Sequence, residues 1–477
     1  MEIPLQKEEY RILEKCECVI DECVQAELSL PEYMPEIIRI IKSCAEVKIN
    51  SCGCTGERCT VDGECELRMI YTSDDGLLYS FSQTRPFSRY CENRAFSNAE
   101  DVNASAEISY VSCRAVNPRR AELKAGVAIK VTAYSACAKS IASSGSSPEI
   151  QQKCKSFGAM SLGCRRTKGF SMSDVCEIGK GGAQFLIGTN ASAVLSDVRK
   201  IGSKLMLIGE AVTEICYVPA ADKSLTEHIR HTMPINQVLE FEGLQENFTG
   251  ETALSIAACD VIIKNSSGGE GNAFDISLGI NATVTMWEEK QYSVITDAYS
   301  ASGELALQKE TAEFLSQVDE IHENRSFRET LDLSKTGVSR LLNLSFGKTE
   351  AEVRVNGDSL TVSGTLKTAL LYRDRSGEAV ILEKAIDYSC ERKLPQSVDS
   401  FFALPGVAVC SVDCIQKSDT QAEIRLDLQL DCRVFSRNQI EIITGMCLDE
   451  AAPGLEALMA SAAATIKEMG CVGGTSP

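Results

Sequence analysis

The sequence lacks a long apolar run. No segment approaches the ~18 consecutive apolar residues that a membrane-spanning helix needs. The first residues, MEIPLQKEEYRI, contain no basic start, no apolar core of signal-peptide length and no small-residue cleavage site. We therefore predict no membrane span and no secretion signal. The chain is expected to be made in a cytosol, where its thiols begin reduced.

Histidine is scarce, and catalytic motifs are missing. The 477 residues include 3 histidines. The pair His228 and His231 has a spacing that suits a metal on a helical face, but ordinary surface histidines explain it better. The sequence contains no GxSxG elbow, P-loop or GxGxxG. We predict a chain that is not an enzyme, with no catalytic, cofactor-binding or metal-binding residues.

Basic tracts are also absent. Lys and Arg number 48 against 67 Asp and Glu, which gives a formal charge of −19. Repulsion from phosphate groups disfavours nucleic acid and anionic membrane surfaces as partners. The negative charge favours solubility, or keeps free copies apart until another interaction joins them.

What the sequence does contain is strict hydrophobic alternation in a frame that recurs three times. The segment CTVDGECELRMIY at 59–71 places its apolar residues on one face, as a half-buried strand does. The same frame returns in LMLIGEAVTEICY at 205–217 and LTVSGTLKTALLY at 360–372. A glycine and a tyrosine keep their eight-residue spacing in all three copies: Gly63 and Tyr71, Gly209 and Tyr217, Gly364 and Tyr372.

A second alternating segment follows each copy at a matching distance. It occupies residues 122–134, 275–287 and 423–435. The fold class predicted from both frames is mainly β, with three tandem β-sandwich-like repeats of antiparallel strands and a few short helices.

The repeat frame sets the expected domain boundaries. The first repeat covers residues 1–145, is rich in cysteine, and includes a helix near 31–42 suggested by the spacing of Met34, Ile37, Ile38 and Ile41. Residues 146–318 form a linker and the second repeat. Residues 319–450 form the third repeat, preceded by a helix-compatible segment at 304–321, and residues 451–477 form a short Ala-rich helix and a disordered end.

Four stretches of the first repeat resemble a known family. LPEYMPEIIRII, AEVKI, VDGECELRMIY and RPFSRY are similar to the SPOCS domain of clostridial sporulation proteins, a family that includes a spore-coat morphogenetic protein binding the coat's basement-layer ATPase. The resemblance covers about residues 8–140 and implies a structural or scaffolding role in the spore envelope. Relatives often end in a LysM module; residues after 450 lack that pattern, so glycan binding does not carry over.

The 22 cysteines are unevenly distributed, with 14 before residue 180 and two between 181 and 320. Cys59 and Cys65 share the inward face of a strand and are expected to be small buried hydrophobes. Cys52 and Cys54 leave the inward phase of the preceding residues, so we expect them at an exposed turn. We hypothesise that Cys16, Cys18, Cys52 and Cys54 form intermolecular disulfides once the mother cell lyses and its reducing cytosol is lost.

These observations and the resemblance together predict a non-enzymatic structural protein of the endospore envelope, in the coat or exosporium. It would self-assemble through its repeated β domains, and its partners would be itself and other envelope proteins. It would occupy the mother-cell cytoplasm during synthesis and the spore surface layers afterwards. Two alternatives remain open: a monomeric adaptor that bridges a coat ATPase to outer layers, and a thiol-rich protein that binds a metal through CGCTGERC.

Overall fold

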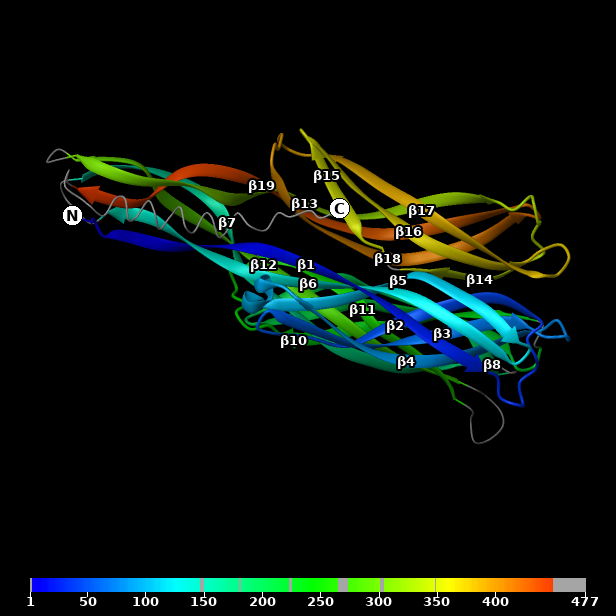
Figure 1. Ribbon diagram of the computed structural model, residues 1–477. Coiled ribbons are helices and arrows are strands. Elements are labelled where there is room, and N and C mark those ends of the chain that lie inside the picture. The colour runs from blue at the N-terminus through cyan, green and yellow to red at the C-terminus, as the bar shows by residue number, and fades with distance from the viewer. Residues whose placement is uncertain are drawn as a thin grey trace.

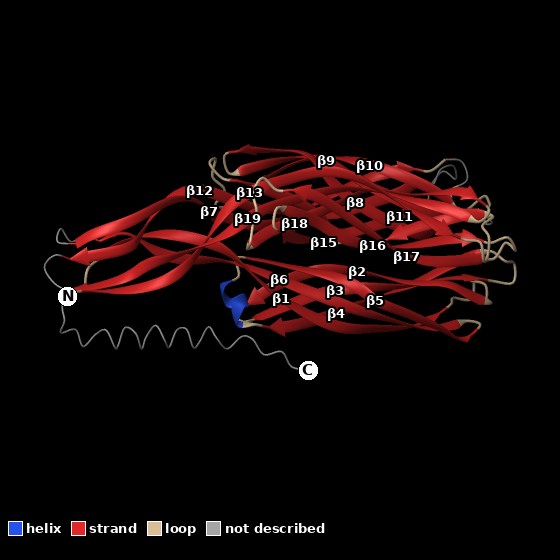
Figure 2. Ribbon diagram, turned by 90° about the horizontal axis from the view of Figure 1, so that it is seen from above, coloured by secondary structure: helices blue, strands red, loops and turns tan. Residues whose placement is uncertain are grey.

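The structure is almost entirely antiparallel β-sheet, as the alternation predicts. It is a computed structural model that describes residues 2–145, 150–179, 182–222, 225–264, 273–300, 304–347 and 349–448. Among these residues the only helix is a short 3-10 turn at Arg94–Asn98 (Figure 2). The strands are β1 (Leu5–Ser29), β2 (Arg39–Thr55), β3 (Arg58–Thr72), β4 (Leu78–Glu92), β5 (Asp101–Asn117), β6 (Arg120–Gly145), β7 (Ile150–Glu177), β8 (Ala183–Ile201), β9 (Lys204–Pro219), β10 (Glu227–Glu240), β11 (Thr249–Lys264), β12 (Ala273–Ser300), β13 (Leu305–Asp332), β14 (Arg340–Phe346), β15 (Ala351–Asn356), β16 (Ser359–Arg373), β17 (Ala379–Lys393), β18 (Phe401–Ser418) and β19 (Gln421–Leu448).

The same sheet order occurs three times along the chain. The first sandwich pairs sheet β1-β6-β5 with sheet β2-β3-β4, and the second pairs β7-β12-β11 with β8-β9-β10. The third pairs β13-β19-β18 with a sheet in which β16 lies between β17 and the split strand β14/β15. Each sandwich has its own apolar core between its two sheets. Cys59 and Cys65 lie in the first of these cores with no exposed surface, which confirms their predicted burial.

The repeated glycine is required because a neighbouring strand presses a carbonyl onto it. A Cβ atom on Gly63 would lie 2.6 Å from the Lys48 carbonyl oxygen, and one on Gly209 would lie 2.2 Å from that of Val194. Each of these two glycines pairs with the residue beside a β-bulge in the adjacent strand, where the backbone is displaced. Gly364 meets the Glu350 carbonyl at 2.6 Å in the same manner.

The repeated tyrosine anchors one end of each sandwich. Tyr71, Tyr217 and Tyr372 are buried, and each hydroxyl reaches a polar group of a nearby segment. Tyr71 donates to the Pro35 carbonyl at 3.0 Å, and Tyr217 donates to a Glu227 carboxylate oxygen at 2.6 Å. The Tyr372 hydroxyl lies 2.8 Å from that of Thr336. A buried hydroxyl needs a hydrogen-bond partner. Each tyrosine therefore holds the segment that carries its partner against the end of its own strand.

We expect Gly209→Ala to lower the free energy of unfolding by about 1–3 kcal/mol, because the added methyl overlaps a backbone oxygen that cannot move without distorting the ladder. Urea unfolding measures the change. Gly53→Ala is the matched control, since a Cβ there meets nothing within 4 Å. Equal stability of the two variants would show that the close approach is not what requires glycine.

Six long strands continue beyond the sandwiches as three paired ribbons. The first halves of β1, β7 and β13 pair with the last halves of β6, β12 and β19. The ribbons run together to the end of the molecule that carries the N-terminus (Figure 1). We call this part the stalk. Its apolar core takes equivalent residues from all three ribbons, Ile141, Val294 and Ile442, and continues with Ala142, Ile295 and Ile443.

The three sandwiches meet again at their opposite end. Ile70, Cys216 and Leu371, which hold the same place in the repeat frame, are buried in one shared cluster. Ile41, Ile187 and Leu342 belong to the same cluster, and each is the extra residue of a β-bulge at the same register position. A bulge redirects a side chain that regular alternation would turn elsewhere. The molecule therefore has a pseudo-threefold arrangement, closed by shared cores at both ends.

Two helices expected from the sequence are absent. Residues 31–38 form a turn and an extended segment that leads into β2, so the prediction of a helix near 31–42 is wrong. Pro35 cannot contribute the backbone N–H that a helix interior requires.

The segment 304–321 is also not a helix, because β13 pairs with β19 along its length. Where a linker was expected at the start of 146–318, β6 continues to Gly145 and β7 begins at Ile150. The C-terminal helix predicted in 451–477 lies outside the described residues.

Candidate assembly and crosslinking sites

Cys52 and Cys54 lie in strand β2 and not at an exposed turn. The ladder between β2 and β3 shifts between Ile49 and Ser51, so one extra residue enters β2 at this point. The shift restores Cys52 and Cys54 to the inward face. Both are half-buried and pack against the core of the first sandwich. The predicted exposure was wrong because the sequence gives no sign of the bulge.

These two cysteines belong to a cluster of five thiols, which we call the thiol cluster: Cys18, Cys52, Cys54, Cys59 and Cys91. Cys59 of β3 lies directly opposite Cys54 of β2 on one side and Cys91 of β4 on the other. The Cys52 and Cys59 sulfur atoms are 3.7 Å apart. Cys18, from the facing sheet, packs against the same core, and it adds to the effect of burial in raising the pKa of Cys91.

Burial raises the pKa of four thiols in the cluster. It raises the pKa of Cys52 to about 11 and that of Cys54 to about 12. Burial likewise raises the pKa of Cys59 to about 11 and that of Cys91 to about 12. Cys16 packs half-buried beside the same core, and burial followed by its neighbour Cys18 raises its pKa. Because the thiolate is the reactive form, these groups react slowly near neutral pH.

The exposed thiols of the described residues are Cys23 and Cys154. Cys23 lies in β1, where Val24, Ala26 and Leu28 are buried, so the alternation turns it outward. The alternation of β1 in the sequence is sufficient to predict this outward position. Cys154 lies in the stalk part of β7. These two positions, and not Cys16, Cys18, Cys52 and Cys54, offer their sulfur atoms at the surface.

Each sandwich contains one sheet that ends, within the described residues, in an edge strand with no second neighbour: β4 in the first, β10 in the second and β17 in the third. These three edge strands differ in sequence. The opposite edges of these sheets face neighbouring sandwiches: Lys48 of β2 pairs with Asp260 of β11 at 2.8 Å, and Asn190 of β8 donates to the Leu344 carbonyl of β14 at 3.2 Å. β4, β10 and β17 each pair on one side only in the described part of the chain. An unpaired edge can accept another strand.

Proline interrupts two of these three edges at the same register position. Pro86 of β4 lies opposite Glu64, and Pro234 of β10 lies opposite Glu210. The corresponding position of β17 is Asp387, opposite Thr365, and it is exposed. Proline on an edge removes an outward N–H and so opposes strand addition. Strand β17 keeps that N–H.

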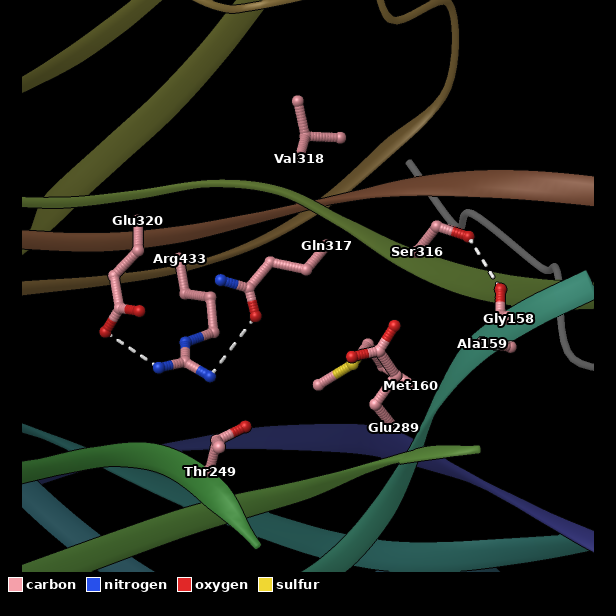
Figure 3. A pocket seen from close by; sticks show the side chains of 10 residues that line it. All are labelled: Gly158, Ala159, Met160, Thr249, Glu289, Ser316, Gln317, Val318, Glu320 and Arg433. Atoms are coloured by element: carbon pink, nitrogen blue, oxygen red, sulfur yellow. Dashed lines mark hydrogen bonds and ion pairs between the residues drawn. The ribbon is translucent and has the colours of Figure 1, made fainter. Parts of the chain in front are cut away.

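A pocket of about 480 Å³ lies where the second and third sandwiches meet the stalk (Figure 3). At its base is Arg433, which is buried and donates to a Glu320 carboxylate oxygen at 2.7 Å and to the Gln317 side-chain oxygen at 3.5 Å. Its Nε atom lies 3.8 Å from a Glu251 carboxylate oxygen. Arg433 thus serves as an ion-pair joint between the two sandwiches.

The charge at this joint predicts a pH dependence of stability. Burial raises the pKa of Glu251 from 4.5 to about 7, although Arg433 and Arg165 oppose the shift. Between these values the folded chain retains a proton that the unfolded chain has lost. The free energy of unfolding should therefore fall by about 1–3 kcal/mol as the pH rises from 4.5 to 7. Glu251→Gln should remove this fall in urea unfolding, whereas Glu289→Gln, in the same pocket but exposed, should keep it. An unchanged pH profile in Glu251→Gln would contradict the assignment.

The histidine pair does not form a metal-binding face. His228 and His231 lie three residues apart in β10, and a strand turns such residues to opposite faces. His231 instead lies 2.9 Å from an Asp174 carboxylate oxygen. A search of the described ranges finds no group of three His, Cys, Asp or Glu side chains arranged to hold a metal ion. It also finds no helix long and apolar enough to cross a membrane.

The fold and these surfaces define a class of protein: three β-sandwiches joined by shared cores, with unpaired outer edges and a thiol-rich first sandwich. Residues 36–116, which extend from the loop before β2 to the end of β5, match the family model described as SipL, SPOCS domain. The match confirms the predicted resemblance for this part of the chain and indicates a sporulation-related protein. No curated protein and no solved structure gives a significant match to the chain.

Proposed function

We propose that this chain is a non-enzymatic structural protein of the endospore envelope, in the coat or exosporium, that self-assembles by strand pairing at the edge of β17. The SPOCS domain supports the link to sporulation. The observation that carries the proposed mode of assembly is the contrast between proline in β4 and β10 and Asp387 in β17.

The pseudo-threefold arrangement supports the same proposal. In a closed arrangement, the surfaces that join the three sandwiches are already buried. Association with another copy must therefore involve other surfaces. Shared cores at both ends make the chain one rigid body. A rigid body with an open strand edge is suited to an ordered protein layer, because added strands fix the relative orientation of neighbours. Exposed Cys23 and Cys154 would then lock neighbouring copies after oxidation, in place of the half-buried Cys16, Cys18, Cys52 and Cys54.

We expect Asp387→Pro to weaken self-association by roughly tenfold or more, equal to about 1.4 kcal/mol, because proline removes the N–H that a second copy would use. Asp387→Ser is the matched control: it also loses the hydrogen bond from Thr365 but keeps the N–H. Sedimentation velocity of the wild type and both variants measures association.

The fold should tolerate proline at position 387, since the other two copies carry it in equivalent ladders. The two variants should therefore differ in unfolding free energy by less than about 1 kcal/mol. Association of Asp387→Pro as strong as that of Asp387→Ser would exclude β17 as the pairing edge. A chain that stays monomeric in every form would favour the alternative of an adaptor that acts through another envelope protein.

A further inference from the structure

We propose that the thiol cluster is an internal disulfide-forming site, oxidised by a small-molecule disulfide to two bonds within one chain. One bond joins Cys59 to Cys52 or Cys54 of the neighbouring strand, and the other joins Cys18 to Cys91 across the two sheets of the first sandwich. The inference rests on the fold of the first sandwich and does not require the proposed assembly.

The first bond follows from the position of Cys59 between strands. Its sulfur atom lies 3.7 Å from that of Cys52, and Cys54 is its direct partner in the ladder. Residues directly opposite in antiparallel strands have Cα atoms about 4.5–5.5 Å apart, within the range that a disulfide spans. Rotation of side chains, with little movement of the backbone, brings Cys54 to bonding distance. Cys52 pairs with Val61 and is a diagonal neighbour of Cys59, so a bond to it also needs a shift of the backbone.

The second bond connects the two sheets. Cys91 is buried in β4, and Cys18 of β1 packs against the same core from the facing sheet. Strands β1 and β4 are edge strands of the two sheets, and the ion pair between Glu22 and Arg89 already holds them together. A bond between Cys18 and Cys91 would covalently close this side of the sandwich.

Each bond joins one half-buried cysteine to one buried cysteine. The half-buried cysteine is the more accessible of the two, so it reacts first. The half-buried thiolate, Cys52 or Cys54, attacks a sulfur of oxidised glutathione and releases one glutathione thiolate. The thiolate of Cys59 then attacks the mixed disulfide and releases the second. Two protein thiols are oxidised, one glutathione disulfide is reduced, and the two protons pass to the released thiolates. Cys18 and Cys91 react in the same sequence.

The raised pKa values make this reaction slow while the sandwich is folded. The thiolate fraction of a group with a pKa near 11 rises about tenfold for each pH unit in the neutral range. The oxidation rate should therefore increase by about tenfold between pH 7 and pH 8. The cluster would stay reduced in a reducing cytosol and become oxidised slowly once that environment is lost.

The test uses the purified full chain, reduced and then incubated with oxidised glutathione. Free thiols are alkylated after unfolding, and intact mass and tryptic peptides are measured without reduction. We expect four cluster thiols of each chain to resist alkylation and to be linked to one another within that chain, whatever bonds the exposed Cys23 and Cys154 make. Trypsin cleaves after Arg58, so a bond from Cys59 to Cys52 or Cys54 should link two separate peptides.

Variants assign each bond. Cys59→Ala should lose the first bond and keep the link between Cys18 and Cys91, whereas Cys91→Ala should lose the second and keep the first. Cys65→Ala is the matched control, because Cys65 is buried on the same face of β3 but outside the cluster. Circular dichroism checks that each variant folds. Alkylation of all five cluster thiols, glutathione adducts that never resolve, or bonds from these cysteines to a second chain would each overturn the proposal.

Discussion

Phe314→Ala is expected to lower the free energy of unfolding by about 3–5 kcal/mol, because it empties the centre of the stalk. The Phe314 ring has no exposed surface and meets rings from both other ribbons: Tyr10 at 4.8 Å and Phe157 at 4.6 Å between centroids. The Tyr10 hydroxyl also accepts a hydrogen bond from the Leu315 N–H at 2.8 Å. The deletion therefore leaves a cavity bordered by all three ribbons.

Tyr299→Ala is the control for this prediction, because Tyr299 lies in the stalk part of β12 but is 58% exposed. It should change the free energy of unfolding by less than about 0.5 kcal/mol. Chemical denaturation followed by tyrosine fluorescence and circular dichroism gives both values. A loss below 1 kcal/mol in Phe314→Ala would mean that the ribbons do not depend on one another.

Leu371→Asp should cost about 4 kcal/mol or more, because it removes a buried leucine and places a carboxylate in the apolar cluster shared by the three sandwiches. The effect should extend beyond the third sandwich. Ile70 and Cys216 come from the first and second sandwiches and contribute to the same cluster. Hydrogen exchange should therefore speed up at the ends of β3 and β9 as well as in β16.

The adjacent residue supplies the comparison. Leu370 is equally buried but points into the core of the third sandwich alone. Leu370→Asp should speed up hydrogen exchange in the third sandwich and leave the ends of β3 and β9 protected. Identical exchange patterns in the two variants would contradict the idea of a cluster shared at this end, and would leave the stalk as the joint between sandwiches.

The strands were predictable because most of them have one buried and one exposed face. The glycine and tyrosine frame carried further information: Gly209 marks the close approach of a carbonyl, and Tyr217 marks a buried hydroxyl with a polar partner. The close carbonyl and the hydrogen-bonded hydroxyl both lie within one sandwich, so each can be recognised from a single residue type at a fixed place in the repeat. The mainly β class follows from them.

The shared cores were not predictable from the same pattern. Ile187 and Leu342 reach the shared cluster through bulges, and a bulge has no signature in alternation. Segment 304–321 has helix-compatible residues, but pairing of β13 with β19 decides its structure. The helical spacing around Ile38 failed for a related reason, since Ile41 points to the shared cluster and Ile38 to solvent.

The cysteine prediction had a mixed outcome that also depends on a bulge. Cys59 and Cys65 are buried as expected, whereas Cys52 and Cys54 join them because of the register shift after Ile49. We therefore propose the intermolecular role for the exposed Cys23 and Cys154, and an intramolecular chemistry for the inner thiols. The bonds of both sets are predictions.

Negative-stain electron microscopy of the purified chain, prepared once with reductant and once after oxidation, tests the central proposal most directly. We predict regular sheets or filaments of the wild-type chain, made more resistant to dilution by oxidation, and their loss in Asp387→Pro. Discrete single particles of the wild type under both conditions would contradict self-assembly of this protein.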